Sequence, residues 1–135
     1  MQWNGDAILQ RIRTAAMRGV VRGTEAVHAR AVRSITSGPK TGEIYRRRGV
    51  EHQASAPGEA PASDTGLLVR ASGTRYEPNE LSGFVNFAAK YAAPLEFGTF
   101  RMEPRPFLRP ALEAERQNIT DGIAAEVRRE FEAMG

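Results

Sequence analysis

The stretch YAAPLEFGTFRMEPRPFLRPALE, from Tyr91 to Glu113, holds the most distinctive side chains of this sequence. Glu96 stands out because it is a carboxylate between two apolar residues, Leu95 and Phe97. A lone buried carboxylate is costly, so it has to be paired or hydrogen-bonded. Acid–base catalysis would need a partner carboxylate, which the neighbouring sequence does not supply. We therefore expect a structural role, in which Glu96 pairs, within the chain or across subunits, with an arginine such as Arg70, Arg101 or Arg105.

Residues for metal or nucleophilic chemistry are scarce elsewhere in the sequence. The two histidines, His28 and His52, have no ligand partner at a useful spacing, and there is no cysteine. The GxSxG pattern of a nucleophile elbow is absent, as are the phosphate-binding patterns GxxxxGK(S/T) and GxGxxG. The sequence predicts no catalytic residue, no metal site and no cofactor, and we do not expect an enzyme.

A second group with chemical potential is YRRR, formed by Tyr45, Arg46, Arg47 and Arg48. These arginines could grip phosphates while Tyr45 stacks on a base. Arginines on a loop are also common at protein interfaces. No helix-turn-helix, zinc-finger or RNP-type aromatic pattern accompanies them. We interpret this segment as a candidate partner-contacting arm, and keep a small basic nucleic-acid-binding protein as the alternative function.

Charge and hydropathy limit the class of protein. The chain has 135 residues, enough for one domain over 1–135, and carries a net charge of +3. Residues 1–50 are strongly basic and contain only three acids, which favours an acidic partner or serves solubility alone. No apolar run approaches the roughly 20 residues that span a bilayer, and the start has no signal-peptide pattern. We expect a soluble protein made in a cytoplasm, with no membrane partner.

Two amphipathic helices must position these groups. The first is predicted from Asp6 to about Ile35, with Asn4 or Asp6 as its cap and an apolar stripe at Ile8, Ile12, Ala16, Val20, Val27, Ala31 and Ile35. Gly19 and Gly23 inside it indicate close approach by a neighbouring element, or a bend. The second helix is predicted from about Phe107 to Ala133. Off the first stripe lies a narrow arc of arginines, which forms either a solvated face or a partner surface: Arg11, Arg18, Arg22 and Arg33.

Between the helices we expect a long arm and a small sheet. The arm covers about residues 38–65 and could contain a hairpin around Arg47-Arg48-Gly49. Strands are predicted at Gly66–Ser72, Leu81–Phe87 and Thr99–Met102, with a turn-rich link before the second. Ala88–Phe97 stays ambiguous because Pro94 disfavours a continuous strand. The fold class is α+β: a small antiparallel sheet packed against two long helices, with a sheet edge left for a neighbouring chain.

The motifs of this sequence resemble those of a family of tailed-bacteriophage head–tail proteins, the tail-component or neck family typified by siphophage gene-product-ten-like proteins. In that family an aromatic-Ala segment leads to Glu-Phe-Gly-Thr, and Pro-Phe-Leu-x-Pro-Ala-Leu opens the final helix. A Pro-Gly-rich arm ending in Asp-Thr-Gly comes earlier, as in His52–Leu68 here. The resemblance covers about Lys40 to the end. Its motif residues include Tyr91, Glu96, Phe97, Gly98, Thr99, Pro106, Phe107 and Pro110.

The resemblance implies assembly and no catalysis. It implies a structural virion protein at the head–tail joint, assembled in the host cytoplasm: a neck, tail-completion or tail-terminator protein. Copies would form a ring around the DNA channel, sixfold on the tail side or twelvefold on the portal side. The neighbours would be phage connector or stopper and tail-tube proteins, with DNA as passing cargo. A ring requires an interface that closes by rotation, which an open sheet edge, an arm and two long helices could supply.

Overall fold

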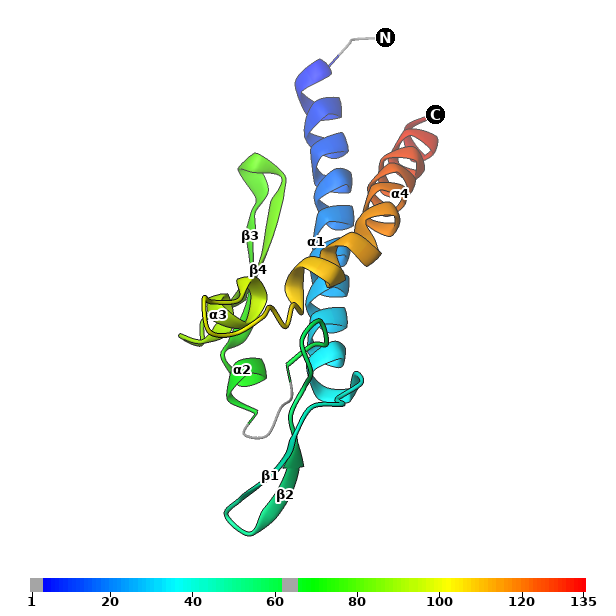
Figure 1. Ribbon diagram of the computed structural model, residues 1–135. Coiled ribbons are helices and arrows are strands. Elements are labelled where there is room, and N and C mark those ends of the chain that lie inside the picture. The colour runs from blue at the N-terminus through cyan, green and yellow to red at the C-terminus, as the bar shows by residue number, and fades with distance from the viewer. Residues whose placement is uncertain (1–3, 62–65) are drawn as a thin grey trace.

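The computed structural model describes residues 4–61 and 66–135 and has an α+β fold, as expected (Figure 1). Long helices form the two ends of the chain, and two antiparallel hairpins lie between them. In order the elements are α1 (Gly5–Ser37), β1 (Ile44–Arg47), β2 (Val50–Gln53), α2 (Leu67–Arg70), β3 (Ser72–Glu77), the 3₁₀ turn η1 (Pro78–Glu80), β4 (Ser82–Phe87), α3 (Ala92–Phe97) and α4 (Leu108–Met134).

Helix α1 begins and ends on local signals in the sequence. The side chain of Asn4 accepts a hydrogen bond from the backbone N–H of Ala7 at 3.2 Å, so Asn4 is the cap and Asp6 lies in the first turn. Gly38 and Pro39 follow the last residue, Ser37. The 33 residues between them span about 50 Å. Both long helices therefore agree with the predicted ranges to within a residue or two.

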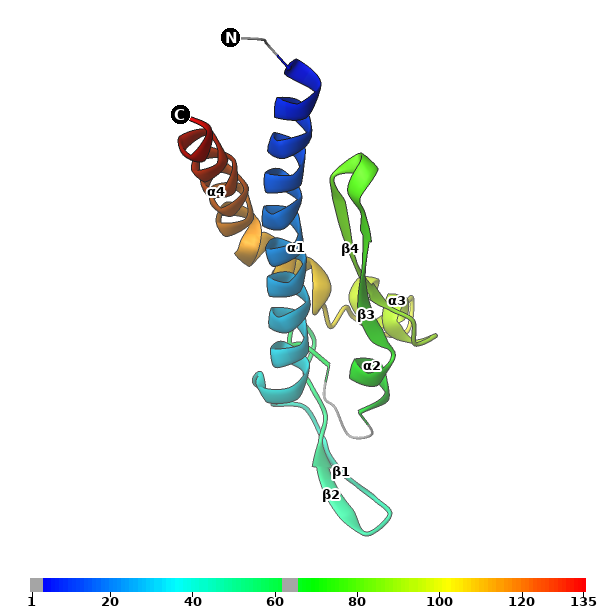
Figure 2. The ribbon, with the colours of Figure 1, turned by 180° about the vertical axis from the view of Figure 1, so that it is seen from behind.

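Helix α1 is the central element of the fold. Figures 1 and 2, seen from opposite sides, show hairpin β3–β4 on one side of α1 and α4 on the other. On the α4 side, a Cβ at Gly19 would lie 2.7 Å from the Cα of Ile123, and one at Gly23 would lie 2.8 Å from the Cγ1 of Ile119. Close approach by a neighbouring element is therefore confirmed, by the backbone of α4 at Gly19 and by the Ile119 side chain at Gly23.

The buried line of α1 differs from the predicted stripe in its first half. Val27, Ala31 and Ile35 are buried as predicted. Before them the buried positions are Ala15, Gly19, Gly23 and Thr24, and the first two lie one residue away from the predicted Ala16 and Val20. The predicted stripe was wrong in this half of the helix because the prediction gave large apolar side chains more weight than small ones. Two helix backbones approach most closely where side chains are smallest, so small residues occupy the contact.

The predicted three-stranded sheet is replaced by two separate hairpins, β1–β2 and β3–β4. The segment predicted as a strand at Gly66–Ser72 contains the one-turn helix α2, and the strand β3 occupies the segment expected to be a turn-rich link. Thr99 and Met102 form only an isolated bridge. The ambiguous segment contains α3. Strand β4 agrees with its prediction, because its alternation is regular enough to read locally.

Hairpin β3–β4 lies on α1 and closes the core. Gly83 packs on Thr24 of α1, and Val85 and Phe87 follow on the same inner face of β4. The ring of Phe87 meets that of Phe107 edge-on, with centroids 4.8 Å apart. The core therefore sits where α1, β4 and the start of α4 meet. Its buried apolar members are Val27, Ala31, Ile35, Leu68, Ala92, Phe107 and Ala111.

Within the predicted arm, the hairpin expected around Arg47-Arg48-Gly49 is confirmed. Its strands pair from Ile44↔Gln53 to Arg47↔Val50, and the hairpin projects beyond the end of α1 (Figures 1 and 2). The chain after it returns to the body, where Gly58 N–H donates to the carbonyl of Pro104 at 3.0 Å. Residues 62–65 of the arm lie outside the described residues.

Replacing Gly19 by alanine tests the close packing of α1 on α4. The new Cβ forces the backbones apart, and overpacking of this kind costs about 1–3 kcal/mol. Alanine recovers at most about 1 kcal/mol through its higher helix propensity. We expect a net decrease of about 1–2 kcal/mol in the free energy of unfolding, measured by urea denaturation.

Gly122→Ala is the matched control, because no atom lies within 4 Å of a Cβ built there. That variant should gain up to about 1 kcal/mol from helix propensity. A Gly19→Ala protein as stable as the Gly122→Ala protein would show that the helices are not in close contact.

Candidate functional site

Glu96 caps the N-terminus of α4 from a distance in the sequence. Helix α3 carries its carboxylate to the first turn of α4, where three backbone N–H groups have no helical partner. Oε2 accepts from the N–H of Phe107 at 2.8 Å and of Leu108 at 3.0 Å, and Oε1 accepts from Arg109 at 2.7 Å. A carboxylate here also faces the positive end of the helix dipole. Glu96 therefore fixes where the last helix starts and where it points.

These contacts give Glu96 a structural role, as expected, but the expected pairing with an arginine of the same chain was wrong. Among the described residues Glu96 has no ion pair. Arg105 instead donates its backbone N–H to the carbonyl of Leu95 at 2.7 Å, and the guanidinium of Arg101 lies over the ring of Phe100. Sequence proximity favoured these arginines, but the chain reversal after Phe97 presents helix N–H groups to the carboxylate instead.

The reversal is built by the Gly-Thr corner. Gly98 has a φ of 77°, and a Cβ on it would lie 2.9 Å from the carbonyl oxygen of Met102. Thr99 and Met102 exchange two backbone hydrogen bonds, of 2.8 and 3.2 Å, and the Thr99 hydroxyl accepts from the N–H of Arg101 at 3.2 Å. Only glycine fits the first position. The corner therefore holds Phe100 and Arg101 at the tip of a tight turn.

The other motif residues divide between core and surface. Phe107 is in the core, and Pro106 and Pro110 line a cleft of about 470 Å³ beside Arg30. Tyr91 lies exposed at the start of α3. Phe97 and Phe100 also face outward, 74% and 92% exposed. The motif thus combines residues that build the start of α4 with aromatic residues that the chain itself leaves uncovered.

An apolar groove adjoins this corner. It has a volume of about 610 Å³, within the range of ligand pockets. Its floor is α1 at Val20 and Val27, one wall is β4 around Phe84, and the other is α4 at Leu112 and Ile119. Phe97 lies at its end, next to the capping carboxylate of Glu96. The groove is lined mainly by apolar side chains, so it offers contact area and few polar groups for chemistry.

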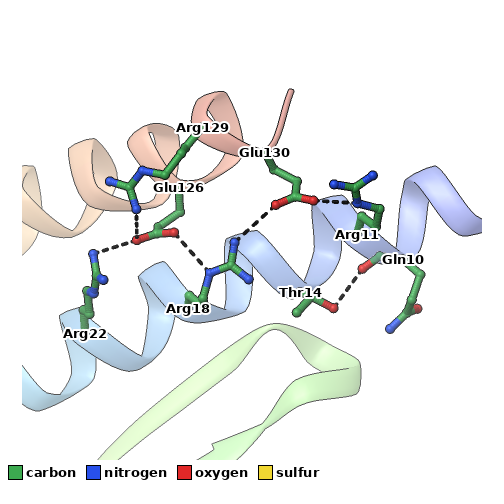
Figure 3. Close-up of polar contacts among 8 residues, drawn as sticks. All are labelled: Gln10, Arg11, Thr14, Arg18, Arg22, Glu126, Arg129 and Glu130. Carbon is green, nitrogen blue, oxygen red and sulfur yellow. Dashed lines mark hydrogen bonds and ion pairs between the residues drawn. The ribbon is translucent and has the colours of Figure 1, made fainter. Parts of the chain in front are cut away.

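The arginine arc of α1 faces α4, where acids neutralise it (Figure 3). Glu126 is 1% exposed and pairs with Arg22 at 2.6 Å and Arg18 at 3.2 Å. One turn on, Glu130 pairs with Arg11 at 2.6 Å. The sequence left open a solvated face or a partner surface. The structure gives a third outcome for Arg11, Arg18 and Arg22, since their partners are in the same chain.

These ion pairs lower the pKa of the acids. The hydrogen bond from Arg18 is the largest cause for Glu126, and the charges of Arg129, Arg22 and Arg18 add to it against the effect of burial. Farther along the interface, Arg30 binds Glu115 at 2.7 Å and lowers its pKa in the same way. Both carboxylates therefore stay ionised to a lower pH than an ordinary glutamate.

The second sequence-predicted group lies on hairpin β1–β2, away from the groove. The Tyr45 ring stacks on that of His52, with centroids 5.6 Å apart. Arg46 and Arg48 are exposed, and Arg48 has a φ of 54°. The structure therefore does not bring the YRRR segment together with the Glu96 motif.

Comparison with known proteins adds no identity. No protein-family model, curated protein or solved structure matches this chain. Within the described ranges, no cluster of three or more His, Asp or Glu side chains could hold a metal ion. His28 instead lies 2.9 Å from the hydroxyl of Ser72. Helices long and apolar enough to cross a membrane are also absent from the part of the chain that the structure describes.

Sequence reasoning missed Phe100, Phe84 and Glu126. An aromatic residue after Gly-Thr, at the tip of a turn, could have indicated the exposure of Phe100. Phe84 lies on the outer face of β4, where alternation around the predicted inner residues would have placed it. Glu126 had no local signal, because its burial depends on a helix more than one hundred residues away in sequence.

Glu96→Ala tests the capping role. Loss of a helix cap costs about 0.5–2 kcal/mol. Because three N–H groups lose their acceptor here, we expect the free energy of unfolding to fall by about 2 kcal/mol. Glu96→Gln keeps one acceptor oxygen and should lose less. Urea denaturation provides the measurement, with the exposed Glu103→Ala as the control, expected within about 0.5 kcal/mol of the unmodified protein. Equal losses for Glu96→Ala and Glu103→Ala would contradict the assignment.

Acid should weaken the α1–α4 interface. The folded-state pKa of Glu126 lies below its ordinary value of 4.5, so its ionised form stabilises the fold above about that pH. As the pH falls through the lowered pKa, this stabilisation is lost, and Glu115 acts in the same direction. Thermal unfolding followed by circular dichroism should show a melting temperature that is steady near neutral pH and falls below about pH 4.5.

Glu126→Gln separates this effect from general acid sensitivity. The variant should melt lower at neutral pH, because its arginine partners lose their counter-charge, and should lose less on acidification. The exposed Glu132→Gln on the same helix should keep the shape of the unmodified pH profile. A Glu126→Gln profile parallel to that of the unmodified protein would refute the role of Glu126.

Proposed function

We propose that this protein is a structural virion component of the head–tail joint of a tailed bacteriophage, a neck, tail-completion or tail-terminator protein, whose copies form a ring around the DNA channel. The observation that carries the proposal is the apolar surface at the Glu96–Pro110 motif, which resembles that of this family. Phe97 lines an apolar groove of about 610 Å³ and is itself 74% exposed, and Phe100, at the tip of the turn that follows, is 92% exposed. Contiguous apolar surface of this kind marks interaction sites in proteins that do not aggregate.

The surface suits assembly because one copy carries two complementary features. The corner at Gly98–Met102 is a rigid turn with an aromatic tip, and the groove is a larger apolar hollow. When different patches of two copies meet, the contact is heterologous and repeats until a ring closes. Both the aromatic corner and the groove would be covered in the assembled particle, by other copies of this chain or by the adjacent connector, stopper or tail-tube proteins. In this proposal DNA passes through the ring as cargo, and the location is the virion.

The alternative, a small basic nucleic-acid-binding protein, loses one of its supports. Arg11, Arg18 and Arg22 of α1 are engaged by acids of α4 and do not form a free basic face. Enzymatic activity gains no support from the Glu96 site either, since its carboxylate is occupied by three backbone N–H groups.

Replacement of the aromatic corner tests the proposal. Phe97→Ser with Phe100→Ser removes exposed side chains and should leave folding intact, as judged by circular dichroism. We expect the unmodified protein to form closed rings at high concentration or on its neighbouring proteins, and the double variant to stay monomeric, as measured by light scattering and negative-stain microscopy.

Leu9→Ser with Phe131→Ser is the matched control, because it also removes two exposed apolar side chains but lies on the distal turns of α1 and α4. This control should assemble normally. If the unmodified chain stays monomeric at its highest soluble concentration and enters no phage particle, the proposed function is wrong. If both double variants assemble like the unmodified protein, the aromatic corner is not the interface.

A further inference from the structure

The charge distribution singles out the β1–β2 hairpin. Four arginines of α1 are paired with acids of α4: Arg11, Arg18, Arg22 and Arg30. In contrast, Ile44–Gln53 contains three arginines and one glutamate, Glu51. Arg46 lies opposite Glu51 in the ladder, and within the described residues neither Arg46 nor Arg48 forms an ion pair. The ten residues of this hairpin therefore carry two more positive than negative side chains, and Arg46 and Arg48 are both exposed.

The hairpin is a free β-ribbon. It projects beyond the end of α1, and none of the labelled helices covers either of its faces (Figures 1 and 2). Ile44 and Val50, which alternate onto opposite faces, are 61% and 57% exposed. A two-stranded hairpin alone is marginally stable in water, so contact with a partner would stabilise it. The major groove of duplex DNA is wide enough to admit a two-stranded β-ribbon.

The turn adds a second, independent observation. Arg48 and Gly49 both have positive φ, 54° and 78°, as a two-residue type I′ turn requires. Asparagine, aspartate or glycine is strongly preferred at the first of these positions, and a long side chain there is strained. Strained backbone conformations of this kind are concentrated at functional positions in proteins. The conformation of Arg48 therefore indicates a functional role for its side chain.

We propose that the β1–β2 hairpin is a DNA-contacting arm, which enters a groove of duplex DNA and places Arg46 and Arg48 on backbone phosphates without reading sequence. Duplex DNA carries a negative charge about every 1.7 Å of its axis, and this dense charge would neutralise neighbouring arginines that otherwise repel each other. Tyr45 and His52 stack on each other, so one face of each ring is covered and cannot stack on a base. This DNA-contacting role depends on the hairpin alone and does not require the proposed ring. In a ring, the hairpins would face the channel.

The test measures binding to a fluorescein-labelled DNA duplex by anisotropy over a series of salt concentrations. Each phosphate contact contributes about −0.9 to the slope of log affinity against log salt. Arg46→Gln with Arg48→Gln should therefore make the slope shallower by about 2 and lower the affinity at least about tenfold at low salt. The duplex sequence should have little effect on either protein.

Arg33→Gln with Arg128→Gln is the matched control. It removes the same charge from two exposed arginines on α1 and α4, and should change the affinity less than about threefold. Equal losses in the two double variants would mean that net charge alone drives binding, and would overturn the inference. So would an unchanged slope in the hairpin variant, or competition by polyglutamate as strong as that by DNA, which would assign the arm to an acidic protein.

Light scattering on the same samples separates this inference from the proposed function. If the unmodified protein forms rings but binds DNA no better than the hairpin variant, the DNA-contacting role is wrong and the assembly role is retained. Hairpin-dependent binding by a chain that never assembles would leave the inference and end the assembly role.

Discussion

The close approach of α1 and α4 is the constraint on which the rest of this structure depends. The two helices lie at opposite ends of the sequence, and their contact closes the fold. Gly19 and Gly23 allow the backbones to come together, and the arginines beside them reach acids of α4. Glu126 could not be buried without them, because a buried charge that loses its partners is strongly destabilising. Apolar packing and charge pairing therefore specify the same arrangement of the two helices.

The Glu96 cap connects this frame to the surface. By holding the first N–H groups of α4, it fixes the start of the helix, and Phe107 can then enter the core. The same chain reversal leaves Phe97 exposed at the groove and Phe100 exposed at the tip of the turn. One short motif thus places residues that stabilise the fold next to residues that the fold does not use. A preorganised surface of this kind would lower the ordering cost of the assembly proposed above.

The arginines of the first fifty residues also divide into some that stabilise the fold and some that are exposed. The sequence showed two basic groups in the first fifty residues, on the first helix and at YRRR, but did not show which of them is neutralised within the chain. Four arginines of α1 pair with Glu126, Glu130 and Glu115 and so serve the fold: Arg11, Arg18, Arg22 and Arg30. On the hairpin Arg46 and Arg48 are exposed and have no acid bound within the described residues. A small chain with a modest net charge can therefore still present one strongly basic element to a polyanion.

The sequence by itself determined the two helices, the α+β class, strand β4, the hairpin at Arg47-Arg48-Gly49 and the structural character of Glu96. These follow from local causes: helical periodicity, caps, strand alternation and turn residues. Only the tertiary structure decided the partners of Glu96, the acids that meet the arginines of α1, the separation of the two hairpins and the apolar groove. Each of these depends on contacts between residues brought together by chain reversals or from distant parts of the sequence. Local patterns carry no information about which distant backbone or charge will lie opposite, because packing selects that partner only when the whole chain has folded.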